Sequence, residues 1–218
     1  SKSKGNIVSP EAYFETHGAD SLRLYHLFMG PPSDSVEWNG RGIEGTKRFL
    51  NKLWDNINAM SAIKVSDNDD ENTEVLLIEL NKTIKAASKD IEEFEFNTIV
   101  SDLMKFNNSV SEYLKIKNNV CESSKNLLIL NFLSLLYPLA PHISSELLEQ
   151  TLGEKVFVKW PEVDERYIID KTYELVIQIN GKKKVTKIVD FNTTEEQAIA
   201  LAEDLLPEII IQDTKKII

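Results

Sequence analysis

The sequence predicts a mainly α-helical protein, an antiparallel helix bundle followed by a small α+β domain of order ββαβ. From about residue 43 to residue 153, apolar residues recur every three or four positions, which is the spacing of one helix face. After Lys155 that spacing gives way to alternation, and Asn180-Gly181 is a dipeptide typical of a tight β-hairpin turn. Because helices joined by short loops pack antiparallel, the helical part is expected to form an up-and-down bundle.

Composition and charge limit the possible functions. The 218 residues are 42% hydrophobic and 28% charged, which is typical of a soluble globular protein. No apolar run reaches the roughly 18–20 residues that a membrane helix needs, so we expect no membrane partner. The net charge of −10 disfavours a polyanionic ligand overall. Residues 61–171, with 20 acidic and 12 basic residues, hold most of the excess negative charge. Both ends of the chain can therefore still present basic patches.

The first elements are short helices. Residues 1–6 show no periodicity and are expected to form a loop. Ser9-Pro10-Glu11 predicts a helix start, with Ser9 as N-cap and Pro10 at the first helical position. Gly18 is expected to end that helix, and a second one runs from Asp20 until Gly30-Pro31-Pro32.

The bundle helices come next in the chain. A long helix is predicted from about Ile43 to Ala62, and its basic residues Lys47, Arg48 and Lys52 lie away from the apolar stripe. Two amphipathic helices are expected after it, and a helix through Leu127–Leu136 is apolar on nearly all sides, so other helices must surround it. Pro138 and Pro141 interrupt it before a last bundle helix from His142 to Gly153.

Alternating patterns predict the strands of the second domain. These are Lys155–Trp160, Tyr173–Ile179, Val185–Phe191 and Glu208–Ile211. Thr194-Glu195-Glu196-Gln197 matches a capping box, which predicts a helix from there to about Leu206.

Most familiar catalytic and metal motifs are missing from the sequence. Cys121 is the single cysteine, which excludes an internal disulfide and a cysteine-built zinc site. His17, His26 and His142 do not stand at metal-ligand spacing, and we expect them to be structural. There is no G-x-G-x-x-G, P-loop or nucleophile elbow.

Two stretches near the start do carry a family signature. S-K-S-K-G-N-I-V-S-P-E, followed by H-G-A-D-S-L-R-L-Y, resembles the second signature of class I aminoacyl-tRNA synthetases and the stem-contact helices behind it. In that family the loop reads K-M-S-K-S, and Ser1, Lys2 and Ser3 match its last three positions.

Later stretches resemble the leucyl-tRNA synthetases within this class. They are Met29-Gly30-Pro31-Pro32 with Glu37-Trp38, Gly42-Ile43-Glu44-Gly45, Arg48-Phe49-Leu50, Phe96-Asn97-Thr98, Pro138-Leu139-Ala140-Pro141-His142 and residues 176–182, V-I-Q-I-N-G-K. The resemblance spans essentially the whole chain.

The resemblance implies a C-terminal fragment of three parts. These are a loop remnant and stem-contact region (1–42), the class Ia anticodon-binding helical bundle (43–160) and a small, incomplete α+β tRNA-binding domain (161–218). It implies ATP-dependent ligation of leucine to tRNA(Leu) in the cytoplasm, with Mg2+. The partners implied are tRNA(Leu) and the missing catalytic domain, not DNA. The fragment alone is expected to be inactive.

The resemblance also suggests site residues. Ser1, Lys2 and Ser3 match the ATP-binding loop, and Lys2 matches the lysine that neutralises the ATP phosphates. Lys47, Arg48 and Lys52 are expected to meet tRNA phosphates, unless they are an ordinary solvated face paired with Glu44 and Asp55. Lys182 and Lys184, with Lys183 and Lys187 nearby, are expected to grip tRNA, unless they only protect a strand edge. Lys184 and Thr186 depart from the usual arginine and lysine of the family.

Two other functions stay open at this point. The chain could belong to a valyl- or isoleucyl-type synthetase, which charging assays would decide. It could also be a non-enzymatic acidic helical scaffold that binds protein, in which case tRNA would not bind.

The role of Lys2 yields the first testable prediction. In the full-length enzyme, Lys2→Ala should slow adenylate formation by roughly 10²–10³, about 3–4 kcal/mol, because a cation is lost where charge develops on the phosphates. The affinity for tRNA should stay nearly unchanged. Pyrophosphate exchange measures the rate, and equal rates for variant and parent would remove Lys2 from the ATP site.

Overall fold

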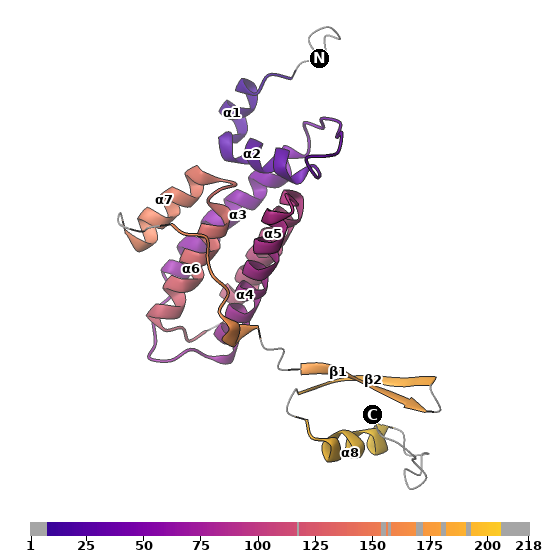
Figure 1. Ribbon diagram of the computed structural model, residues 1–218. Coiled ribbons are helices and arrows are strands. Elements are labelled where there is room, and N and C mark those ends of the chain that lie inside the picture. Colours follow the sequence, from indigo (N-terminus) through magenta and orange to yellow (C-terminus); the bar gives the residue numbers. More distant parts are fainter. Residues whose placement is uncertain are drawn as a thin grey trace. The chain divides into compact units, whose positions relative to one another are not determined.

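Figure 1 shows the computed structural model of the chain, which describes residues 8–116, 118–153, 156, 158–168, 172–179, 182–190 and 193–205. The chain divides into two compact units, residues 1–168 and residues 169–218. The first unit is helical and the second combines a two-stranded sheet with a helix. This confirms the predicted fold class.

Two short helices precede the bundle, α1 (Glu11–His17) and α2 (Ala19–Phe28). Pro10 already has helical angles (φ −69°, ψ −23°) and takes the N-cap position predicted for Ser9, so the helix is entered one residue later. Gly18 separates the two helices at φ +81°, a backbone angle that side chains with a Cβ rarely adopt. The chain therefore changes direction sharply at Gly18, as its sequence position predicted.

The bundle consists of α3 (Ile43–Ser61), α4 (Glu71–Glu92), α5 (Phe96–Leu114) and α6 (Glu122–Leu136). In Figure 1 these four helices run alongside one another, and α7 (Pro141–Leu152) packs against α3 and α6. Proline stands at the first position of α7, where its missing N–H costs nothing. The bounds of α3 and α7 agree with those predicted to within one residue, and α6 begins at Glu122, before the predicted segment Leu127–Leu136.

Helix α6 lies at the centre of the core. Its side chains at Leu128, Ile129, Phe132, Leu133, Leu135 and Leu136 are all 1% exposed or less. The Phe132 ring meets Phe106 of α5 edge-on, with the ring centres 4.8 Å apart. Burying each such side chain stabilises the fold by about 1.5–3 kcal/mol. The expectation that other helices surround this segment is confirmed.

A polar network crosses the core between α3 and α5. The Asn56 side-chain amide donates to the Asn107 backbone and side-chain oxygens at 3.0 and 2.8 Å, and to Ser111 Oγ at 2.8 Å. Ser111 Oγ in turn donates to Asn56 Oδ1 at 3.2 Å. Because each buried group finds a partner, the network fixes one register between the two helices.

The predicted strand Lys155–Trp160 is wrong for the residues that the structure describes there. Val156 and residues 158–160 form no strand and lie in an irregular segment. Val156, Val158 and Trp160 pack on the bundle core, and the Trp160 indole N–H donates to Ser88 Oγ of α4 at 2.8 Å. The alternation thus comes from one-sided burial against helices, and the described residues of this segment pair with no strand.

The connection stays with the bundle until the second unit begins. The Asp164 N–H donates to Asn81 Oδ1 of α4 at 2.8 Å. A short 3₁₀ turn, η2 (Glu165–Tyr167), contacts the same helix. Val163 and Tyr167 pack against the bundle core, and the first unit extends to Ile168.

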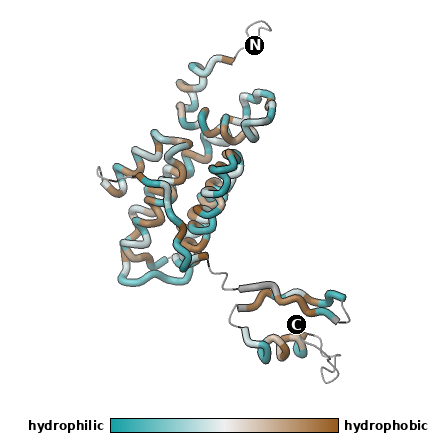
Figure 2. Tube along the Cα trace, in the orientation of Figure 1, coloured by the Kyte–Doolittle hydropathy of each residue, from teal (hydrophilic) through white to brown (hydrophobic). Residues whose placement is uncertain are grey.

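The second unit contains an antiparallel hairpin of β1 (Thr172–Ile179) and β2 (Lys182–Asp190). Ile177 pairs with Val185 and Gln178 with Lys183, so Lys184 is the extra residue of a β-bulge. Val189 is buried whereas Ile188 is 67% exposed, which is the alternation expected of a strand. Figure 2 shows the hairpin as hydrophobic along much of its length and hydrophilic near its turn.

The predicted capping box opens the last helix, α8 (Glu195–Leu205). The Thr194 N–H donates to Gln197 Oε1 at 3.0 Å, and the Gln197 N–H donates to Thr194 Oγ1 at 3.3 Å. This prediction is confirmed. The Asn180-Gly181 turn and the strand Glu208–Ile211 lie outside the described residues.

The cap of α4 gives a stability prediction. Asp70 accepts from the N–H groups of Thr73 (2.9 Å) and Asn119 (2.7 Å). Burial raises the pKa of Asp70, but these hydrogen bonds outweigh it and hold the pKa below its ordinary value. Asp70→Ala should therefore lower the free energy of unfolding at pH 7 by about 1–2 kcal/mol.

The effect should depend on pH with a definite sign. Because the folded pKa of Asp70 is depressed, its contribution is present above the unfolded pKa of about 4 and is lost as the pH falls through the folded value. Urea unfolding of parent and variant at several pH values measures this difference. Asp67→Ala, an exposed acid in the same connector, serves as control. A difference that does not narrow in acid would show that Asp70 stabilises the fold without its charge.

Candidate nucleic-acid interface

An aromatic cluster holds the segment between α2 and α3. The Trp38 ring meets Tyr13 of α1 and Tyr25 of α2 edge-on, with ring centres 5.3 and 5.1 Å apart. The Tyr25 hydroxyl donates to the Asn39 carbonyl. The Tyr25 ring lies so close to Gly42 that a Cβ there would overlap it, so this position needs glycine. The cluster fixes α1 and α2 against the start of α3.

Polar contacts also join α1 to α3. His17 Nε2 lies 2.8 Å from Glu44 Oε1, and the Lys47 ammonium donates to the Thr16 carbonyl at 2.7 Å. The hydrogen bond with His17, aided by the nearby charges of Lys47 and Arg48, lowers the pKa of Glu44. Glu44 is therefore engaged by His17 instead of pairing directly with the basic residues beside it.

The predicted basic residues of α3 lie on the outside of the bundle. Arg48 and Lys52 are exposed, and Lys47 is half-buried. Arg48 Nε donates to the Glu44 carbonyl at 3.3 Å and the Lys52 ammonium to Asn108 Oδ1 at 2.9 Å. Within the described part of the chain, none of the three forms an ion pair with a carboxylate. Their N–H groups therefore donate to neutral oxygens, and acids act on their charges only over a longer distance, Glu44 on Lys47 and Arg48 and Glu112 on Lys52.

Other lysines of the bundle behave differently. Lys89, Lys105 and Lys115 are exposed, and each pairs with an acid three or four residues away on its own helix. The distances from ammonium to carboxylate are 3.8, 2.7 and 2.6 Å. These pairs cancel charge locally, whereas the three α3 cations donate to neutral oxygens, as Lys125 also does to the carbonyls of Ser61 and Ile63.

Lysines also gather on β2 in the second unit. Lys182, Lys183, Lys184 and Lys187 are all exposed. Lys184 occupies the bulge, where the strand twists more strongly and the side chain is redirected. Ser1, Lys2 and Ser3 lie outside the described residues, so their assignment to an ATP loop stays a prediction.

Sequence reasoning missed a contact between α2 and the α6–α7 connection. Asp20 is 7% exposed; its Oδ2 accepts from the Ile143 N–H at 2.8 Å, and its Oδ1 lies 2.8 Å from His142 Nδ1. Arg23 donates to the carbonyls of Leu139 (3.2 Å) and Pro138 (3.0 Å). Asp20 thus caps α7 while Arg23 binds the preceding turn. The family stretch G-A-D-S-L-R contains both residues and was the signal that could have found them.

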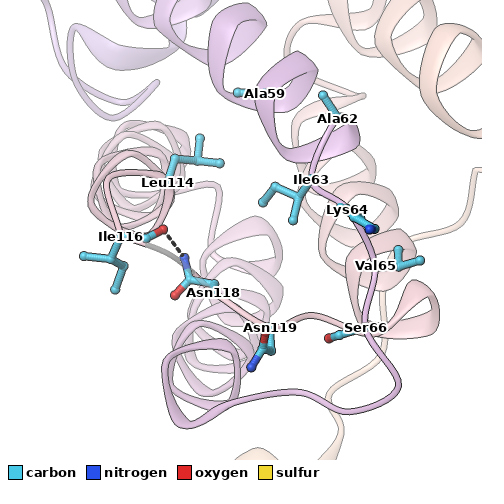
Figure 3. Close-up of a pocket in the computed structure, with 10 residues that line it drawn as sticks. All are labelled: Ala59, Ala62, Ile63, Lys64, Val65, Ser66, Leu114, Ile116, Asn118 and Asn119. Carbon is cyan, nitrogen blue, oxygen red and sulfur yellow. Dashed lines mark hydrogen bonds between the residues drawn. The ribbon is translucent and has the colours of Figure 1, made fainter.

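A pocket of about 520 Å³ lies at the end of the bundle where α3 and α5 finish (Figure 3). Ile63, Lys64 and Leu114 are among the residues that line it, together with Asn118, whose amide donates to the Ile116 carbonyl at 3.1 Å. Asn118 Oδ1 is buried without a hydrogen-bond partner. None of the predicted site residues lines this pocket.

The described residues offer neither a metal cluster nor a membrane span. They contain no group of three or more histidine, cysteine, aspartate or glutamate side chains that could hold a metal ion. No helix among them has the length and apolar character needed to cross a bilayer.

The described part of the chain is a helical bundle followed by a small α+β unit, with cations on α3 that form no ion pair and with lysines on the hairpin. A family model described as the anticodon-binding domain of tRNA ligase matches residues 74–199. This match covers more than half of the chain. The chain therefore belongs to the family of anticodon-binding domains of tRNA ligases.

Individual relatives narrow the comparison. The chain is 42% identical over 207 residues to a leucine–tRNA ligase of Borrelia hermsii, which covers 93% of this chain and 23% of the relative. It is 39% identical to a leucine–tRNA ligase of Petrotoga mobilis (96% and 27%) and 36% identical to one of Pseudothermotoga lettingae (100% and 28%). The chain spans about a quarter of the length of these curated relatives.

A solved structure resembles the chain as well. It is the ternary LeuRS–tRNA–LeuAMS complex of Agrobacterium radiobacter K84, with a TM-score of 0.75 and 29% identity. The match covers 95% of this chain and 27% of that one. The similarity therefore includes both the helical bundle and most of the smaller unit after it.

The contact through Asp20 yields a prediction. Asp20→Ala should lower the free energy of unfolding by about 2–4 kcal/mol, because a buried carboxylate that accepts two hydrogen bonds is lost and the Ile143 N–H is left without a partner. Urea unfolding measures the change. Glu149→Gln, an exposed acid on the same α7, should change stability little. If both variants unfold alike, Asp20 does not join α2 to α7 energetically.

Proposed function

We propose that the chain is the tRNA-facing C-terminal part of a leucine–tRNA ligase, the enzyme that joins leucine to tRNA(Leu) with cleavage of ATP to AMP and pyrophosphate. The observation that carries this proposal is the similarity to leucine–tRNA ligases over 93–100% of the chain. The solved relative, a LeuRS–tRNA–LeuAMS complex, supports the same assignment.

The cations of α3 are proposed to contact tRNA phosphates. Lys47, Arg48 and Lys52 form no ion pair with a carboxylate of the described residues, and RNA stems are bound mainly through backbone charge and shape. Local pairs of the kind formed by Lys89, Lys105 and Lys115 would leave less charge for a polyanion. Lys182 and Lys184 on the hairpin are proposed as a second phosphate contact.

The chain is proposed to dock tRNA and to leave the chemistry to the rest of the enzyme. ATP and Mg2+ would act in the catalytic domain of the same polypeptide, where Lys2 is proposed to neutralise the phosphates. Because that domain is needed for the reaction, the 218-residue chain alone is expected to be inactive. We place the complete enzyme in the cytoplasm.

A titration with tRNA(Leu) tests the docking role. The logarithm of the binding constant should fall with log salt by roughly 0.7–0.9 per phosphate neutralised. The triple variant Lys47→Gln, Arg48→Gln, Lys52→Gln should therefore reduce this slope by roughly 2–3 if each residue neutralises one phosphate. Fluorescence titrations at two salt concentrations provide the measurement.

The chain offers a matched control for this experiment. Lys89→Gln, Lys105→Gln, Lys115→Gln changes the net charge by the same amount but removes only lysines that are already paired. Its slope should stay near that of the parent. Equal effects of the two triple variants would mean that only total charge matters. If the parent did not bind tRNA, an acidic protein-binding scaffold would be favoured instead. If the intact enzyme charged valine or isoleucine, the amino acid assigned to it would be wrong.

A further inference from the structure

The turn between α4 and α5 has an unusual residue at a strained position. The Glu95 N–H donates to the Asp90 carbonyl at 2.8 Å and the Phe94 N–H to the Ile91 carbonyl at 3.4 Å, which is the Schellman ending of a helix. Glycine usually occupies the left-handed position of this motif. Here it is Phe94, at φ +59°, the one residue other than glycine with positive φ among the described residues.

The side chain of Phe94 gains little from the fold in return. It is 65% exposed and touches Phe96 edge-on, with ring centres 5.9 Å apart. A bulky residue in the left-handed region is costly, and a large exposed aromatic ring adds a second cost. Glycine would relieve the backbone, so the ring must be explained by something that the isolated unit does not contain.

The charges around Phe94 select the kind of partner. Residues 89–98 contain Asp90, Glu92, Glu93 and Glu95 but only one basic residue, Lys89, which already pairs with Glu93 at 3.8 Å. Burial, and then the negative charges of Asp102 and Glu93, raise the pKa of Asp90 despite Lys89 nearby. Such a surface repels RNA phosphates. It complements a protein surface that is basic around an apolar hollow.

The position of the turn selects the partner further. It stands at the start of α5, the helix that also packs against α2, so it lies at the end of the bundle near α1 and α2 (Figure 1). On the proposed function, the segment before α1 is the ATP loop of the catalytic domain. The relatives are about four times as long as this chain, so a large protein surface is available to this end of the bundle.

We propose that Phe94, flanked in the sequence by Glu92, Glu93 and Glu95, docks into a basic, apolar-lined surface on the remainder of the ligase polypeptide. This inference rests on the proposed function. Phe94 provides apolar contact, and the carboxylates provide charge complementarity that orients it. The contact would hold the bundle in place independently of tRNA.

Hydrogen exchange of the full-length ligase and of the 218-residue chain tests this docking. Amides of residues 94–97 should exchange at least tenfold more slowly in the full-length protein, without RNA and independently of protein concentration. Phe94→Ala should abolish that protection. Phe94→Asn should do the same and guards against misfolding, since asparagine tolerates the left-handed backbone. Val75→Ala, at an exposed apolar site near the start of α4, should leave it intact.

The charge requirement has its own variants. Glu92→Gln, Glu93→Gln, Glu95→Gln should reduce the protection, whereas Glu122→Gln, Glu146→Gln, Glu149→Gln on other exposed surfaces should not. Equal exchange rates in the two proteins would overturn the proposal. So would protection that appears only with tRNA, which means base stacking, or only at high concentration, which means a second copy. Leucine charging, measured in parallel, reports separately on the proposed function.

Discussion

Helix α6 imposes the constraint on which the rest of the structure depends. Its segment Leu128–Leu136 is apolar on nearly every side, so it can be stable only when other helices enclose it. Helices α3, α4 and α7 do so directly, and α5 reaches it through the contact of Phe106 with Phe132. With the centre fixed in this way, charged residues of the enclosing helices are left to the outside. The functional surface is a consequence of how the core is filled.

The charge of the surface is organised more finely than its sum suggests. A chain of net charge −10 can bind a polyanion only where basic groups escape cancellation. Lys89, Lys105 and Lys115 do not escape it, because each forms an ion pair with an acid on its own helix. Lys47 and Lys52 instead donate to neutral oxygens on other helices. Glu44 and Asp55 stand at the same spacing from Lys47 and Lys52, so the contacts made with other helices, and not the spacing of acids in the sequence, distinguish these two lysines.

Sequence reasoning found the features that depend on local signals. The helix start near Ile43 and the capping box at Thr194 depend on residues within a few positions, and the fold class depends on the periodicity. Two kinds of feature were out of reach. Asp20 and Arg23 act on partners more than 110 residues away, which no local pattern encodes. The alternation of apolar residues before Trp160 reflects burial on one side of the segment. In the sequence, such burial against helices gives the same pattern as burial in a sheet.

The buried network of Asn56, Asn107 and Ser111 has a consequence for how this family can change over time. Replacing any one member strands the hydrogen-bonding groups of the other two in an apolar interior, a loss of about 1–3 kcal/mol per unpaired group. Replacing all of them together by apolar side chains of similar volume can be nearly neutral. The three sites should therefore behave as one evolutionary unit. Among homologues, they are expected to be retained as a set or exchanged as a set.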